Sequence, residues 1–142
     1  MGQKQTNVAT ILANLHSTNS GYDVLRYFCL PDMLGKEADM VLYMMGKNLA
    51  RQSECATTQE IQEFFRHTGW GELLLTTEKR KGYQFILEGE VVQARIETIQ
   101  AIEFYLESGF LAESLTMIDN NQYECFVDLK QDHAKLEVIT SS

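Results

Sequence analysis

The 142-residue sequence has few basic residues, few cysteines, one proline and no long apolar run. Twelve Lys and Arg stand against twenty Asp and Glu, a net charge of −8, so neither nucleic acid nor an anionic membrane is an expected partner. The longest apolar run, Met40 to Met45, is far shorter than the ~20 residues of a membrane-spanning helix. With only Pro31 and no Gly/Ser-rich linker to interrupt it, the sequence predicts a single domain over residues 1–142.

Cysteine and histidine are too few and too scattered to indicate a metal or redox site. Cys29, Cys55 and Cys125 form no Cys-x-x-Cys pair, and the histidines form no His-x-x-x-His pair. No cysteine has a neighbouring base, and Cys125 alternates with apolar strand residues, which is typical of a buried structural thiol. We therefore expect no metal, no cofactor and no enzymatic activity. The lack of a signal peptide predicts reduced thiols and a cytoplasmic location.

Helical patterns dominate the first half of the sequence. Residues 1–20 are polar, and we expect them to be flexible or to form a short helix. Tyr22 to Leu30 has helical spacing, and we expect Pro31 to end that helix. Asp39 to Gln52 predicts the next helix. Gly46 lies in its middle, where glycine costs about 1 kcal/mol against alanine, so another backbone is expected to approach closely there.

Thr57 and Glu60 have capping-box spacing and predict the start of a third helix, which Gly69 is placed to close in a left-handed conformation. Cys55 precedes this helix and Trp70 follows it directly.

The second half of the sequence predicts strand, strand, helix, strand, strand. Alternating residues indicate a hairpin over Leu73–Leu87 and another over Tyr123–Val138, with a helix at Tyr105–Ile118 between them. Residues 89–104 stay open, because Val92, Ile96 and Ile99 are spaced as in a helix whereas residues 102–104 would suit the start of a strand. The predicted class is α+β: N-terminal helices packed on an antiparallel sheet of about four strands, with a ββαββ C-terminal half.

Three groups of motifs together resemble the YslB-like family, uncharacterised proteins of Gram-positive bacteria. They are Leu30–Gly35 with Leu42–Arg51, Phe64–Phe65 with Gly69–Gly71, and Leu106–Glu113. That family is similar in fold to heme-nitric-oxide sensors, small TRAPP vesicle-tethering subunits and 4-vinyl reductase domains. The resemblance implies a TRAPP-like α+β sandwich, homodimers and an apolar cavity. It implies no activity, because proteins of this fold differ widely in function.

Two departures from these relatives argue against heme or metal. Heme binding needs an axial histidine on a helix beside the cavity, and none of His16, His67 and His133 is placed for it. The 4-vinyl reductase relatives often carry a cysteine cluster near the third and fourth strands, where this sequence has only Cys125.

The leading functional hypothesis is a domain that binds a small apolar or amphipathic ligand. Aromatic residues beside glycines and an adaptable methionine motivate it, although each also suits an ordinary core. Lys47 and Arg51 are either solvated charges, bridged to acids such as Glu54, or a polar anchor for the ligand. The expected lining and anchor residues are Tyr43, Met44, Trp70, Phe104, Phe110, Lys47 and Arg51.

The alternative hypothesis is a homodimeric interaction module without a bound ligand. Its expected interface residues are Met40, Gly46 and Gly109, since glycines allow two helices to approach closely. Gly109 equally suits packing inside the chain or space left for a ligand. On the dimer hypothesis, a bulky residue at Gly46 should split the dimer and leave the fold intact.

Overall fold

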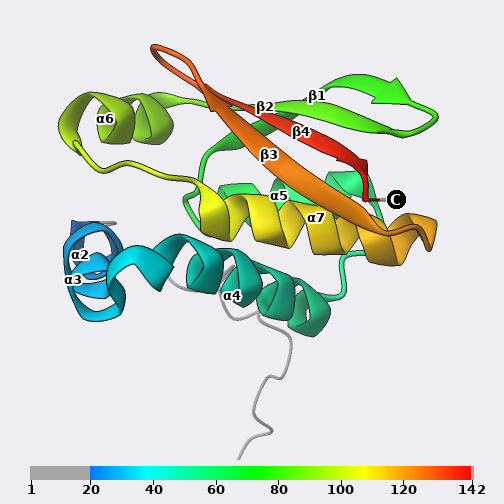
Figure 1. Cartoon of the computed structure of the whole chain (residues 1–142). Helices are drawn as coiled ribbons and strands as arrows, with labels where there is room; N and C mark the ends of the chain where they lie inside the picture. The colour runs from blue at the N-terminus through cyan, green and yellow to red at the C-terminus, as the bar shows by residue number, and fades with distance from the viewer. Residues whose placement is uncertain (1–19, 142) are drawn as a thin grey trace, which may run out of the picture.

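The computed structural model describes residues 20–141, and Figure 1 shows how their helices and strands are layered. A four-stranded sheet lies over α5 (Thr58–His67) and α7 (Tyr105–Asp119), and α4 (Ala38–Ser53) lies on the other side of α7. This arrangement confirms the α+β class; the segment expected over residues 1–19 lies outside the described residues. The other elements are α2 (Ser20–Val24), the π-helical turn η1 (Leu25–Cys29), α3 (Leu30–Leu34), the 3-10 turn η2 (Gly35–Glu37), α6 (Glu90–Thr98), β1 (Glu72–Lys79), β2 (Gly82–Glu88), β3 (Tyr123–Leu129) and β4 (Ala134–Thr140).

The sheet is antiparallel throughout, with strand order β1-β2-β4-β3, so the two predicted hairpins pair through β2 and β4. Its register places Leu73 opposite Leu87 and Phe85 opposite Leu136, and all four side chains are buried on the face toward the helices. Cys125 is also buried, and that burial, reinforced by neighbouring carboxylates, raises the pKa of its thiol well above the usual range. The prediction of a buried structural thiol is therefore confirmed.

The predicted end of the first helix at Pro31 is wrong, because the chain stays helical through the proline. The wide turn η1 closes with the Leu30 N–H donating to the Leu25 carbonyl, and Pro31 then lies in the first turn of α3. A proline costs little there, since the first N–H groups of a helix have no partner in any case. The segment ends at Gly35, whose φ is +62°.

The start and end of α5 match the predicted signals. The Thr57 hydroxyl oxygen accepts a hydrogen bond from the Glu60 N–H at 3.1 Å, and the Glu60 carboxylate accepts one from the Ala56 N–H at 3.2 Å. Gly69 follows the helix with a φ of +75°, the left-handed conformation expected of it. The turn then directs Trp70 back into the interior. The backbone N–H of Trp70 donates to the Phe65 carbonyl at 2.9 Å.

Residues 89–104, for which the sequence allowed a helix or a strand, contain a helix. Glu90–Thr98 forms α6, and residues 99–104 form a link to α7 that contains no strand. Phe104 ends this link, buried beside the start of α7. The strand alternative is wrong for residues 102–104, because they do not take part in the pairing of β1 to β4 and the Glu103 side chain binds Arg26 instead.

Helix α7 is the centre of the fold, and every residue from Leu106 to Leu115 is buried. A helix buried on all sides must be covered on all sides, and here the sheet covers one side and α4 the other (Figure 1). The sequence predicted only one apolar stripe along this helix. The second layer of helix explains why its glycine, serines and glutamates are buried as well.

Candidate functional site

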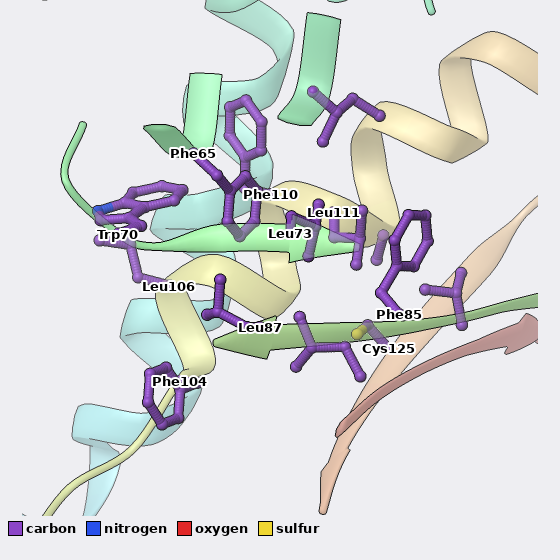
Figure 2. Packing of buried hydrophobic residues seen from close by; sticks show 14 of the residues in the cluster. Phe65, Trp70, Leu73, Phe85, Leu87, Phe104, Leu106, Phe110, Leu111 and Cys125 are labelled. Carbon is purple, nitrogen blue, oxygen red and sulfur yellow. The ribbon is translucent and has the colours of Figure 1, made fainter. Parts of the chain in front are cut away.

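The aromatic residues predicted to line a cavity fill the interior instead. Trp70, Phe104 and Phe110 are 3%, 1% and 0% exposed. Phe64 stacks on Phe110 with ring centroids 4.2 Å apart, and Trp70 meets the rings of Phe64, Phe65 and Phe110 edge-on at 5.0 to 5.6 Å. Figure 2 shows Trp70, Phe65 and Phe110 converging between β1 and α7. These rings line neither of the two apolar hollows described below.

Tyr43 and Lys47 form a small polar cluster between α4 and β3. The Tyr43 hydroxyl donates to the Glu124 carboxylate at 2.5 Å and accepts from the Cys125 N–H at 3.0 Å. Lys47 Nζ lies 2.9 Å from the same carboxylate and 5.0 Å from the centroid of the Tyr43 ring. Lys47 is buried rather than solvated, so its charge is matched inside the protein. Met44 is exposed on the neighbouring surface of the helix.

Arg51 is paired with an acid from another helix, not with Glu54 as the sequence suggested. Its Nε lies 2.9 Å from the Glu113 carboxylate of α7, and its Nη1 donates to the Asn48 side chain. Lys47 and Arg51 therefore bind different carboxylates. The structure does not bring them together with the predicted aromatic residues as one ligand site.

The two glycines predicted at a dimer interface meet within one chain, where α4 crosses α7. A Cβ added at Gly46 would overlap the Leu106 carbonyl oxygen and lie 2.8 Å from the Phe110 nitrogen. A Cβ added at Gly109 would overlap the Tyr43 carbonyl oxygen. The expected close approach of another backbone at Gly46 is confirmed, and it is intramolecular. A bulky residue there would strain the fold, contrary to the expectation that the fold would stay intact.

Met40, the third predicted interface residue, lies on the surface. It borders a hollow of about 400 Å³ between α4 and β3, together with Tyr43, Tyr105 and Phe126. Met40 and Phe126 are 60% and 57% exposed, which is unusual for large apolar side chains.

Sequence reasoning missed a buried network of charges below the N-terminal helices. Arg26 is 2% exposed and bonds two carboxylates: its Nε lies 2.9 Å from Glu103, and its Nη2 lies 2.6 Å from Glu107. Its Nη1 also donates to the Tyr22 hydroxyl at 2.7 Å. Burial, together with the negative charge of Glu107, raises the pKa of Tyr22 to about 12. All three nitrogens of this guanidinium are satisfied.

A second buried arginine, Arg95 on α6, is satisfied only in part. Its Nε lies 2.9 Å from the Asp23 carboxylate, its Nη1 lies 3.5 Å from the Gly69 carbonyl, and its guanidinium lies 5.5 Å from the Tyr22 ring. Its Nη2 is buried and has no hydrogen-bond partner among the described residues. An unpaired buried donor costs roughly 1–3 kcal/mol of stability, so a hydrogen-bond acceptor placed beside this atom would be favourable.

Arg95 lies in the wall of an apolar groove of about 420 Å³ between α6 and the N-terminal helices, which we call the α6 groove. Residues at helical spacing on one face of α6 form one wall, while Val92 on another face packs into the core. The sequence carried a signal for this site, because Arg95 interrupts an apolar pattern between Val92 and Ile99. The groove is lined by Asp23, Phe28, Val91, Ala94, Arg95, Thr98 and Ile99.

Residues 20–141 contain neither a cluster of metal ligands nor a membrane-spanning helix. No three His, Cys, Asp or Glu side chains in this part of the chain gather closely enough to hold a metal ion. None of its helices has the length and apolar character to cross a membrane.

Solved structures with the same arrangement of elements define the class of fold. A vinyl-4-reductase family protein from Methanocaldococcus jannaschii matches with a TM-score of 0.68 at 17% identity, covering 95% of this chain and 89% of that one. The phenol-responsive sensory domain of the transcription activator PoxR, solved with phenol, matches with a TM-score of 0.62 at 14% identity, covering 88% and 76%. At these identities the likeness establishes the fold alone.

Sequence similarity defines the family within that fold. The chain belongs to the family of proteins of unknown function DUF2507, which it matches over residues 19–140. It is 33% identical over 110 residues to the uncharacterized protein YslB of Bacillus subtilis (strain 168), covering 78% of this chain and 74% of that protein. The resemblance to the YslB-like family is thereby confirmed.

Proposed function

We propose that this protein is a non-enzymatic domain that binds a small amphipathic molecule in the α6 groove. The observation that carries the proposal is the coincidence of an apolar groove with a buried, partly unsatisfied arginine in its wall. Ligand sites typically combine a mostly apolar lining with a few polar groups that orient the ligand. The sensory domain of PoxR, which shares the fold, was solved with phenol and adds support for a small ligand.

The proposed site is the α6 groove and not a cavity lined by the aromatic residues that the sequence predicted. The interior position is occupied by Phe64, Trp70 and Phe110, whose rings are in contact. The α6 groove is instead open, and its Phe28 side chain is 63% exposed. A cytoplasmic site of action belongs to the same proposal, supported by the free thiols of Cys55 and Cys125.

Native mass spectrometry and NMR of the full chain test this function. We expect an adduct on freshly purified protein, or shifts of the Val91 and Ile99 methyl resonances when phenol is titrated as a first probe. Ala94→Trp fills the groove and should abolish either signal. Gln93→Trp is the matched control, because Gln93 is not among the groove residues and its side chain donates to the exposed Glu97 carboxylate. Binding that survives Ala94→Trp, or the lack of any adduct and any shift, would refute the proposal.

A second candidate function is favoured by the exposed apolar surface between α4 and β3. Met40, Tyr105 and Phe126 gather around the hollow there, and such a patch suits contact with a second copy of the chain. Sedimentation velocity tests it: Phe126→Asp should convert a dimer to monomer. Leu74→Asp, at an exposed apolar position of β1, is the control and should not. A wild-type monomer at all concentrations would exclude this function.

A further inference from the structure

The charges around the α6 groove disfavour an anionic ligand, even though an arginine lies in its wall. Two guanidinium groups, Arg26 and Arg95, face three carboxylates, Asp23, Glu103 and Glu107, which leaves one negative charge in excess. The charge of Arg95 is already opposed by Asp23 at 2.9 Å. An added carboxylate in the groove would meet the Asp23 carboxylate, which lines the same groove and repels a like charge.

Arg95 and Asp23 also leave one hydrogen-bond donor and one acceptor unused among the described residues, and the two are complementary. Arg95 Nη2 is a donor without an acceptor among the described residues. Asp23 uses Oδ1 to accept from Arg95, and its Oδ2 accepts no hydrogen bond from the described part of the chain. A ligand group that accepts one hydrogen bond and donates another would complete both. Hydroxyl and primary amide groups do this without carrying charge.

The rest of the groove sets the size and polarity of the ligand. Its walls contain Phe28, Val91, Ala94 and Ile99, so the body of the ligand is apolar. The hollow of about 420 Å³ is large enough for a single aromatic ring or a short alkyl chain. Ser114 Oγ is also buried without a partner among the described residues, but Ser114 is not one of the residues that line the α6 groove.

We infer, resting on the binding function proposed above, that the α6 groove selects a neutral amphipathic molecule. The ligand is an alcohol or a primary amide on a small apolar body. Arg95 donates to its oxygen, and Asp23 accepts its O–H or N–H. Asp23 sets the selectivity by cancelling the charge that would otherwise attract a carboxylate.

NMR titration of the full chain with compounds of nearly the same shape tests the inference. Benzamide accepts and donates, acetophenone only accepts, and benzoate is anionic. We expect benzamide to bind about tenfold or more tightly than benzoate, with acetophenone between them, as one hydrogen bond and one charge repulsion would give. In Asp23→Asn, which removes the opposing charge, benzoate should gain about tenfold and approach or overtake benzamide.

The outcomes separate this inference from the proposed function. Shifts at Val91 and Ile99 with the expected order, and the gain for benzoate in Asp23→Asn, support both. Benzoate binding in the same groove as tightly as benzamide, or an unchanged ratio in Asp23→Asn, overturns neutral selectivity and leaves the binding function standing. If none of the compounds shifts these resonances, and no adduct is found on the purified protein, both fail. Thermal unfolding of Asp23→Asn verifies that the variant is folded.

Discussion

Arg26 and Arg95 are both almost fully buried beside Tyr22, yet their surroundings differ. Arg26 bonds two carboxylates and a phenol hydroxyl, with every nitrogen satisfied, where the N-terminal helices meet the start of α7. Arg95 contacts one carboxylate and, at longer range, one carbonyl, and its Nη2 has no partner among residues 20–141; it borders the α6 groove. The contrast indicates that the Arg26 network stabilises the fold, whereas the hydrogen bonding of Arg95 within these residues is incomplete without a further partner.

The largest effect on stability is expected from removing Arg26, whose hydrogen bonds are all satisfied. Arg26→Met should lower the free energy of unfolding by about 3–5 kcal/mol, because it leaves the fully buried Glu107 without its cation. Urea denaturation measures the loss. The control is Arg66→Met, since Arg66 pairs with Glu72 at the surface and its removal should leave stability nearly unchanged. Equal losses in the two variants would contradict the structural role given to Arg26.

The next largest effect is expected where α4 packs closely against α7. Gly46→Ala should cost about 1–3 kcal/mol, because a Cβ there overlaps the Leu106 carbonyl and forces α4 away from α7. Gly21→Ala is the matched control in α2, where the added Cβ meets no atom of another described element within 4 Å. Thermal unfolding of both variants gives the comparison. A Gly46→Ala protein as stable as wild type would show that the two helices can separate at little cost.

Local signals explain how much of this fold was predictable. Thr57 and Gly69 mark both ends of α5 because capping and left-handed turns depend on neighbouring residues. Strand alternation likewise predicted the two hairpins. Pro31 misled because a proline breaks a helix interior but fits a first turn, and sequence alone does not say which position it occupies.

The candidate site depended on contacts that are distant in sequence. Arg26 meets Glu103 and Glu107, which follow it by 77 and 81 residues, and no pattern in the sequence connects them. Trp70 and Phe110 were rightly singled out as large apolar groups, but whether they line or fill a cavity depends on rings from another helix.

A smaller effect on stability is expected at Arg95, whose hydrogen bonding to the described residues is incomplete. Arg95→Met should cost about 1 kcal/mol, well below Arg26→Met, because it also removes a buried donor that lacks a partner in the described part of the chain and leaves Asp23 where water reaches it. The same variant should weaken benzamide and acetophenone alike and keep the preference between them, because both accept from Arg95 through a carbonyl oxygen and only benzamide donates to Asp23. Urea denaturation and the NMR titration report the two quantities separately. A loss as large as that of Arg26→Met would mean that Arg95 is a structural residue first.

The smallest effect concerns Glu124, a partly exposed carboxylate that contrasts with the buried Glu107. Partial burial alone would raise its pKa, but hydrogen bonds from Tyr43 and Lys47 outweigh burial and hold the pKa below the usual range. A lowered pKa in the folded state contributes stability above the unfolded pKa of about 4.3, and that contribution is lost as pH falls through the folded pKa. Tyr43→Phe should therefore cost about 0.5 kcal/mol at pH 7, the low end for a partly exposed hydrogen bond, and less in acid.

Tyr105→Phe is the control for this pH dependence, because Tyr105 borders the same hollow while its hydroxyl makes no hydrogen bond to the described residues. Urea denaturation of both variants between pH 7 and pH 3 measures the difference. The Cys125 N–H also loses its acceptor in Tyr43→Phe, and that part of the cost does not depend on pH. A cost that stays constant down to low pH would therefore assign the role of Tyr43 to the Cys125 backbone rather than to Glu124.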